Sequence, residues 1–212
     1  MSAPQSYYVP VDAGEAEFTE KRSRFLGHVR RVETEAEARA FLDEMRKKYY
    51  DARHNCWCYV LHEGGVVRYG DDGEPQGTAG QPMLNVFQRE GVENVVCVVT
   101  RYFGGVLLGA GGLTRAYAKS AKDALDAAGK ARMRLWSAVT VDCPYPMLER
   151  LKLLAAAHGG TVEGTDFGAA VSVRILLPQE NAAGFDAALT ELSAGTMTAW
   201  REGERFLPGP RE

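Results

Sequence analysis

A run of apolar, mostly β-branched residues that leads directly into a glycine-dense segment constrains the fold of this chain most strongly. Residues 95–99 read Val-Val-Cys-Val-Val, and five glycines then fall within residues 104–112. The first pattern predicts a buried strand, and the apolar period up to residue 128 predicts a long helix. Glycine leaves backbone amides uncovered and a helix start carries partial positive charge, so this order suits an anion. A turn that only packs a helix closely on a sheet has the same sequence.

Basic residues accompany the glycines, and no carboxylate occurs between residues 95 and 122. Arg101 follows the predicted strand, while Arg115, Lys119 and Lys122 recur at i, i+4 and i+7, on one face of the predicted helix. Such a face favours phosphate groups, although a solvated helix face has the same pattern. We take these four cations as candidate phosphate contacts. The candidate glycines are Gly104, Gly105, Gly109, Gly111 and Gly112.

The expected elements divide the chain into two domains. Up to residue 135, strands alternate with amphipathic helices, beginning with a strand at residues 6–13. The order is then strand, helix, two strands, helix and strand within about 65 residues, which is typical of a ferredoxin-like domain. The first and last strands of this order are expected at residues 138–143 and 197–201. We therefore predict an α+β protein with a first domain at residues 1–135 and a ferredoxin-like (βαββαβ) domain at residues 136–212, a length that accommodates both.

An acidic segment, residues 71–80, has no apolar period and is expected to be an exposed, irregular loop. Asp71, Asp72 and Glu74 could hold magnesium with the help of a bound phosphate, and Gln76 could bind a partner. Asp-Gly and Glu-Pro also form ordinary turns, which is the interpretation we favour. We therefore expect no metal or cofactor, except magnesium if the chain binds a nucleotide.

Nucleotide-binding motifs fail on spacing. A Walker loop requires lysine and a hydroxyl residue after its second glycine, but Ala110 and Gly111 follow Gly109. A dinucleotide fingerprint beginning at Gly109 has Thr114 where the third glycine is needed. No serine or cysteine nucleophile motif accompanies His54, so we expect no catalytic residue. A phosphotransferase that uses residues 104–112 remains the alternative function.

Charge is distributed unequally between the domains. The net charge is -3, and residues 137–212 contain 6 basic and 10 acidic residues against 19 and 18 before them. A polyanion is therefore expected on the first domain, and a protein partner on the acidic second domain.

Four cysteines in apolar segments are expected to be buried, reduced thiols. The polar start and the absence of a long apolar run predict a cytoplasmic protein without a membrane partner. We expect a monomer.

Four blocks of the sequence resemble the signatures of the IMPACT/YigZ family. They are residues 21–25 (KRSRF), 52–56 (ARHNC), 71–80 (DDGEPQGTAG) and 101–105 (RYFGG), and residues 109–117 extend the match. The resemblance implies a β-α-β sandwich like the second domain of a small-subunit ribosomal protein, followed by a ferredoxin-like domain. It also implies kinship with eukaryotic translational regulators.

The blocks add basic and aromatic residues to the candidate set, namely Arg22, Arg24, Arg53, His54 and Tyr102. Together with the basic helix face and the glycines, they favour a phosphate-bearing partner. Our hypothesis is a translation-associated regulatory protein that binds RNA or the ribosome through a basic, glycine-rich surface of its first domain. The alternative is an enzyme that binds a nucleotide or another phosphate at the same glycines.

Overall fold

The computed structural model describes residues 7–212, which form two compact units. The first unit comprises the described residues through Met133 together with Pro208–Glu212, and the second is Arg134–Leu207. The last five residues, which the sequence assigned to the second domain, therefore belong to the first unit. The backbone N–H of Glu212 donates to the carbonyl oxygen of Lys130 at 2.8 Å, and Arg211 pairs with Asp12 at 2.9 Å. Residues 1–6, including the start of the first predicted strand, lie outside the described part.

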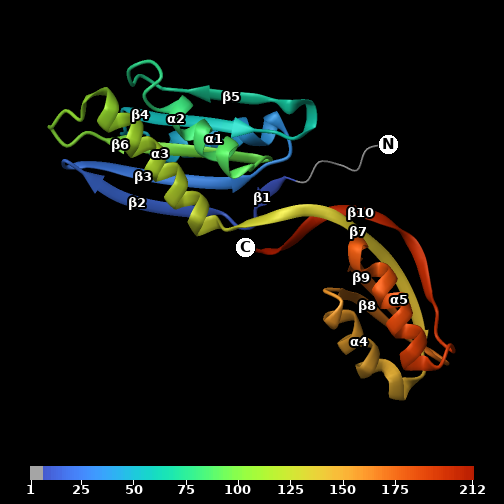
Figure 1. The fold of residues 1–212 in the computed structure, drawn as a ribbon. Coiled ribbons are helices and arrows are strands. Elements are labelled where there is room, and N and C mark those ends of the chain that lie inside the picture. The colour runs from blue at the N-terminus through green and yellow to red at the C-terminus, as the bar shows by residue number, and fades with distance from the viewer. Residues whose placement is uncertain (1–6) are drawn as a thin grey trace. The chain divides into compact units, whose positions relative to one another are not determined.

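A five-stranded antiparallel sheet forms the centre of the first unit (Figure 1). Its order is β2 (Gly14–Glu20), β3 (Ser23–Arg31), β6 (Val95–Tyr102), β4 (His54–Val60) and β5 (Val67–Gly70). The apolar strand predicted from the sequence is the central strand β6, in which every residue before Tyr102 is buried. Both faces of β6 are covered, which explains why its sequence is continuously apolar rather than alternating.

Three helices cover this sheet. The helices α2 (Gly80–Glu90) and α3 (Gly109–Ala128) lie on one face, in front of the strands in Figure 1. The helix α1 (Glu35–Lys48) packs on the other face, against Val96 and Val98 of β6. At its start the Oγ1 atom of Thr34 accepts the backbone N–H of Glu37 at 3.2 Å, as expected of an N-cap residue. The first unit is thus an α+β domain, as the sequence predicts.

The sequence did not predict strand β2. The expected strand at residues 6–13 is in fact the short β1 (Tyr8–Pro10), which pairs with β7 (Lys130–Cys143) and not with the first sheet. The missed strand β2 pairs with β3 along its whole length. It lies at the sheet edge, and only Ala16 and Phe18 pack against the core, so its sequence is mostly acidic and polar. An edge strand of this composition carries little apolar signal.

The second unit has the ferredoxin-like order that the sequence predicts. After β7 come α4 (Leu148–Ala157), β8 (Thr161–Phe167), β9 (Val171–Pro178), α5 (Gln179–Ser193) and β10 (Ala199–Arg211), with short 3-10 turns at Tyr145–Met147 and, in the first unit, Glu63–Gly65. The sheet order is β8-β9-β7, with β10 on the free side of β7. The first and last strands of this order, β7 and β10, are longer than predicted. In β10, two glycines and two prolines among residues 203–210 conceal the strand from sequence patterns.

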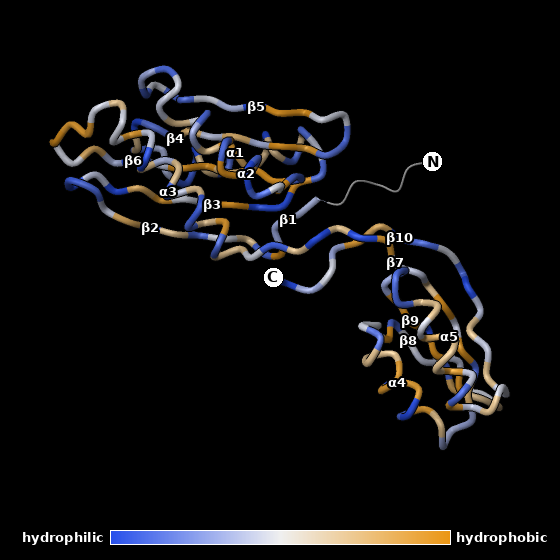
Figure 2. Tube along the Cα trace, viewed as in Figure 1, coloured by the Kyte–Doolittle hydropathy of each residue, from blue (hydrophilic) through white to orange (hydrophobic). Residues whose placement is uncertain are grey.

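Apolar residues also occur away from the cores, in the segment between β6 and α3. Figure 2 shows hydrophobic colour at the tip of this segment, at the edge of the first unit. Phe103 is 48% exposed and Leu107 is 82% exposed. These two apolar side chains of the segment therefore lie at the surface and not in either core.

All four cysteines are free and buried, as expected. Among residues 7–212, every helix falls short of the length or the apolar character that crossing a membrane requires.

Candidate functional site

The segment between β6 and α3, residues 103–108, is here called the glycine loop. A Cβ atom on Gly104 would lie 2.0 Å from the carbonyl carbon of Arg22, so only glycine lets the β2–β3 turn approach this closely. Gly105 and Gly109 have φ angles of +82° and +71°, in the left-handed region. Three of the candidate glycines are therefore required by the backbone itself. Gly111 and Gly112 lie in the first turn of α3.

The first turn of α3 is arranged to attract negative charge. The N-cap residue is Leu108, whose side chain has no oxygen to accept a backbone N–H, and residues 109–112 contain no carboxylate. The first N–H groups of a helix have no partner within the helix and carry partial positive charge. The start of α3 can therefore stabilise a bound anion.

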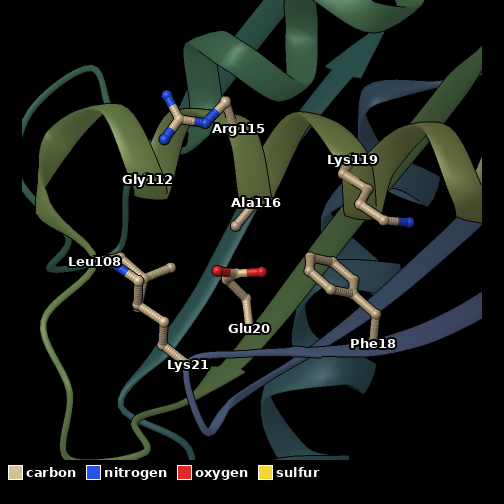
Figure 3. Close-up of a pocket in the computed structure, with 8 residues that line it drawn as sticks. All are labelled: Phe18, Glu20, Lys21, Leu108, Gly112, Arg115, Ala116 and Lys119. Carbon is tan, nitrogen blue, oxygen red and sulfur yellow. The ribbon is translucent and has the colours of Figure 1, made fainter.

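A small groove of about 180 Å³ lies between α3 and the end of β2 (Figure 3). We call it the cationic groove, because Lys21, Arg115 and Lys119 line it together with Glu20 and Phe18. Lys21 and Arg115 make no ion pair with a described residue, whereas Lys119 pairs with Asp123 and lies over the ring of Phe18. Figure 3 shows the Glu20 carboxylate pointing toward α3 between these cations. The groove thus has more positive than negative groups.

Lys122 does not join this groove. Its Nζ atom lies 2.5 Å from Asp126 and 3.7 Å from Glu90, beside Lys130. The sequence contained the signal for this pairing, because Asp123 and Asp126 follow Lys119 and Lys122 at i+4. These carboxylates begin immediately after the stretch without acids, and they compensate two of the four predicted cations.

Arg22 and Arg24 lie at the β2–β3 turn and differ in their partners. Arg22 is exposed in the left-handed region (φ +67°) and makes no ion pair within residues 7–212. Arg24 pairs with Glu17 at 2.8 Å and lies over the ring of Tyr102. The hydroxyl of Tyr102 donates to Asp51 at 2.7 Å, and burial together with Asp51 raises the pKa of Tyr102 to about 12. Arg22 is therefore available to a ligand, while Arg24 and Tyr102 have partners in the fold.

A larger cavity of about 380 Å³ adjoins the same residue, Leu108, which lines both spaces. We call it the Arg101 cavity. The polar part of its lining is Arg53, His54, Glu74 and Arg101. The apolar part comes from the glycine loop and α3, with Phe103, Leu107, Leu108, Ala110 and Leu113.

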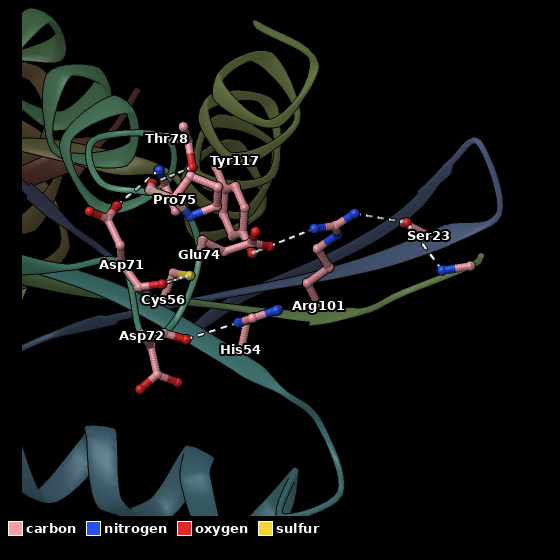
Figure 4. Close-up of polar contacts among 12 residues, drawn as sticks. Ser23, His54, Cys56, Asp71, Asp72, Glu74, Pro75, Thr78, Arg101 and Tyr117 are labelled. Atoms are coloured by element: carbon pink, nitrogen blue, oxygen red, sulfur yellow. Dashed lines mark hydrogen bonds and ion pairs between the residues drawn. The ribbon is translucent and has the colours of Figure 1, made fainter. Parts of the chain in front are cut away.

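Arg101 is the centre of a buried polar network (Figure 4). The residue is 5% exposed, and its Nη1 atom donates to Oε1 of Glu74 at 2.7 Å. Its Nη2 atom donates to Oγ of Ser23 at 3.3 Å, and the hydroxyl of Tyr117 donates to Glu74 at 2.8 Å. Burial, reinforced by Cys56 and Glu74, raises the pKa of Tyr117 far above its usual value. The charge of Arg101 is thus balanced inside the fold. The sequence had instead suggested that Arg101 is exposed and contacts a phosphate.

The carboxylates of residues 71–80 hold the loop together and attach it to the sheet and to α3. Asp71 accepts three backbone N–H groups, those of Gly77, Ala79 and Gly80, at 2.8–3.0 Å. Asp72 accepts the backbone N–H of Asn55 at 2.7 Å. The loop is irregular, as predicted, but it is not fully exposed: Glu74, Thr78 and the residues that follow are buried, while Gln76 is exposed. Within residues 7–212, no group of three or more His, Cys, Asp or Glu is placed to hold a metal ion.

Half-buried His54 and exposed Arg53 contribute polar groups to the lining of the Arg101 cavity. The Nδ1 atom of His54 lies 2.9 Å from the carbonyl oxygen of Asp72, which can only accept, so Nδ1–H donates. In the neutral ring Nε2 then keeps its lone pair as an acceptor. Arg53 is exposed and has no ion-pair partner among the described side chains.

Comparison with known proteins places the chain in a family. The model of the Impact N-terminal domain matches residues 21–125, and a domain of unknown function, DUF1949, matches residues 141–196. IMPACT family member YvyE of Bacillus subtilis (strain 168) is 36% identical over 200 residues, which cover 94% of this chain and 92% of YvyE. The chain belongs to the IMPACT family. IMPACT family member YigZ of Escherichia coli (strain K12) is 35% identical over 180 residues, 84% of this chain and 88% of YigZ.

A solved structure confirms the fold of this IMPACT family chain. This crystal structure of a hypothetical protein is 33% identical in sequence, and the match covers 92% of this chain and 96% of the other, with a TM-score of 0.58. The resemblance inferred from the four sequence blocks is therefore confirmed.

The four blocks that carry the IMPACT resemblance meet around the glycine loop. The turn at residues 21–22 contacts Gly104, and Ser23 of the same block binds both Arg101 and the N–H of Gly104. Glu74, from the acidic block, binds Arg101 and Tyr117. Sequence reasoning missed the roles of Ser23 and Tyr117, because a residue type does not reveal a partner far away in the chain. Their membership of the family blocks was the one signal that could have found them.

Proposed function

We propose that this IMPACT family protein is a translation-associated regulator that binds RNA, in particular ribosomal RNA, through the basic surface around its glycine loop. One observation carries the proposal. Lys21, Arg22, Arg53 and Arg115 make no ion pair with any described residue, and all four surround this loop. Basic residues elsewhere in the first unit are mostly paired, for example Arg30 with Glu44 and Arg31 with Glu33.

Unpaired cations are suited to RNA for a thermodynamic reason. A cation that already holds a carboxylate must lose that partner to bind a phosphate, whereas a free cation gains the contact and releases counterions. The uncapped start of α3 adds backbone N–H groups that can bind a phosphate oxygen. Kinship with eukaryotic translational regulators supports RNA of the translation machinery as the target, and a cytoplasmic location belongs to the same proposal.

The test compares two double charge reversals in the full chain. Lys21→Glu/Arg115→Glu alters the cationic groove, and Lys47→Glu/Arg89→Glu changes two exposed cations that also make no ion pair among residues 7–212. Binding is measured by co-sedimentation with purified bacterial ribosomes and by fluorescence anisotropy of a labelled oligouridylate, at about 50 and 200 mM salt. We expect the groove variant to lose at least about tenfold in affinity, as two lost phosphate contacts should cause. The matched variant should stay within about twofold of the parent protein.

Two results would contradict the site assignment. Unchanged binding of the groove variant would remove the cationic groove from the interface. Equal losses in the two variants would show that binding follows net charge alone. Circular dichroism of both variants confirms that each remains folded, so that a loss of binding is not mistaken for unfolding.

A phosphotransferase is the second candidate, favoured by the uncapped first turn of α3 beside Arg53 and His54. In this function the turn would hold a nucleotide phosphate. Magnesium would have to come with the nucleotide, because Asp71, Asp72 and Glu74 are held in hydrogen bonds of the fold. Calorimetry with magnesium and each nucleoside triphosphate tests it, and saturable heat would favour the enzyme over the RNA-binding protein.

A protein partner on the second domain stays a prediction. Its excess of acidic residues is partly compensated on its own surface, since Glu163 pairs with Arg205, Asp166 with Arg174 and Asp186 with Arg201. The remaining acidic residues, together with exposed apolar side chains such as Trp200, would form such an interface. The test is affinity purification of the full chain and of a variant whose acidic residues in the second domain are neutralised. A partner that binds this surface should be retained by the parent protein and lost from the variant.

A further inference from the structure

The Arg101 cavity has features that RNA binding does not use. Its volume of about 380 Å³ falls in the range typical of small-molecule sites. Its lining combines polar side chains with apolar side chains of the glycine loop and α3. A cavity with both kinds of lining fits a ligand that has a polar head and an apolar body.

The polar side of the cavity carries net positive charge. Arg101 and Glu74 neutralise each other, which leaves Arg53, without an ion-pair partner in the described chain, and the uncapped start of α3. Arg101 is more than nine-tenths buried, and its Nε atom has no hydrogen-bond partner in the described part of the chain. The Nε2 atom of His54 adds one acceptor. One free cation and one helix start match a single negative charge better than a polyphosphate.

The apolar residues of the cavity lining are partly exposed to water, and a bound ligand would cover them. Leu107 is 82% exposed and Phe103 is 48% exposed, although both line the cavity. Burial of these side chains against an apolar body would remove their surface from water, which is the main favourable contribution to such binding. Left-handed glycines at Gly105 and Gly109 flank this part of the loop.

We propose that the Arg101 cavity is a binding site for a small organic carboxylate with an apolar body. The carboxylate binds Arg53 and the first N–H groups of α3, and the apolar body packs against Phe103, Leu107 and Leu113. This site shares Arg53 and the start of α3 with the surface proposed for RNA, but its apolar residues Phe103, Leu107 and Leu113 do not line the cationic groove. A failed test at these apolar residues therefore leaves the RNA proposal for Lys21 and Arg115 standing.

The experiment is a titration of the ¹⁵N-labelled full chain followed by NMR. The probes are 4-phenylbutyrate and hexanoate, each beside its uncharged amide. We expect the carboxylates to shift the backbone signals of residues 103–113 and to bind about tenfold more tightly than the amides, the effect of one charged contact. Signals of residues 20–22, at the far side of the groove, should move less.

Three variants locate the two ends of the ligand. Arg53→Gln should weaken the carboxylates by about tenfold and leave the amides unchanged, because it removes only the charge. Leu107→Ser should weaken both kinds of probe, and its side chain is exposed, so folding is not at risk. Lys47→Gln, a distant exposed cation, is the matched control and should change nothing.

The proposal is overturned by any of three results. The first is the absence of shifts at residues 103–113 up to about 10 mM of either carboxylate, the weakest range that would count as binding. The second is equal affinity for carboxylate and amide. The third is an unchanged affinity in Leu107→Ser, which would place the apolar body elsewhere.

Discussion

The two sides of the glycine loop use the same kinds of residue in opposite ways. In the cationic groove, Lys21 and Arg115 are exposed and make no ion pair with the described residues. In the Arg101 cavity, the arginine is buried and its charge is balanced by Glu74 at 2.7 Å. Lys21 and Arg115 therefore remain available to a ligand, whereas buried Arg101 holds the fold together.

The elements joined by Arg101 explain why this charge is buried. Arg101 belongs to β6, Ser23 to β3, Tyr117 to α3, and Glu74 to the acidic loop. Removing charges from water is costly, and a buried pair is tolerated when hydrogen bonds satisfy both partners. The network therefore fixes where the acidic loop and α3 lie relative to the strands, and so it shapes the cavity beside them.

The largest effect is expected from breaking this pair. Glu74→Ala should lower the free energy of unfolding by about 3–5 kcal/mol, because it leaves Arg101 buried without a counter-charge. Glu20→Ala, in the exposed cationic groove, should change it by no more than about 0.5 kcal/mol. Urea unfolding of both variants measures the difference. Similar small effects in the two variants would show that depth does not separate the two sides.

The glycines of the loop give the next largest effect. Gly104→Ala should lower the free energy of unfolding by at least about 2 kcal/mol, because its Cβ would lie 2.0 Å from the carbonyl carbon of Arg22. Gly105→Ala meets no atom within 4 Å and should cost about 1–2 kcal/mol, owing to its φ angle of +82° alone. Thermal unfolding of the two variants ranks them. The reverse order would show that the β2–β3 turn can move away from the loop.

Tyr117 provides a pH-dependent test of the cavity side. At about pH 8, Tyr117→Phe should lower the free energy of unfolding by about 1–2 kcal/mol, because the hydrogen bond to Glu74 is lost. Burial raises the pKa of Tyr117 in the folded protein above its usual 10.0, so only the unfolded chain releases this proton above about pH 10. The parent protein therefore loses stability as the pH rises, and the variant lacks this contribution. Urea unfolding from about pH 8 to 10.5 should show that the difference in free energy of unfolding between the parent protein and the variant becomes smaller. A constant difference would contradict the assignment.

The smallest effect on stability is expected in the groove. Lys21→Ala/Arg115→Ala should alter the free energy of unfolding by no more than about 0.5 kcal/mol, since neither side chain has an ion-pair partner in the described structure. The same variant should reduce the salt dependence of oligouridylate binding by about 0.7 per lost contact. Chemical unfolding and anisotropy over a salt series measure both quantities. A stability loss comparable with that of Glu74→Ala would remove the distinction between the two sides.

The parts of this fold that could be predicted are those that depend on local patterns. The apolar run at β6, the Thr34 cap of α1 and the ferredoxin-like order all follow from spacing within short windows. Strand β2 could not be recognised, because an edge strand with alternating acids has little apolar signal. The fold class and the family resemblance were correct because several such signals agree.

The candidate site was only partly predictable for a different reason. Sequence showed that Arg101 and Glu74 lie in notable segments, but the pairing joins residues 27 positions apart, and Ser23 is 78 positions from Arg101. Contacts over such distances depend on how the sheet is assembled, and the sequence pattern contains no record of them. The pairs of Lys119 and Lys122 were recoverable, because their carboxylates lie within one helical turn.

The return of the last five residues to the first unit makes the second domain an insertion in topological terms. Its first residue follows Met133 and its last precedes Pro208, so both of its ends connect to the same unit. A truncation at residue 135 would therefore remove Glu212, whose N–H binds the carbonyl of Lys130, along with the end of β10. A deletion that joins residue 133 to residue 208 through a short linker would preserve these contacts. Dissection of the two domains should accordingly proceed by excision rather than by shortening the chain.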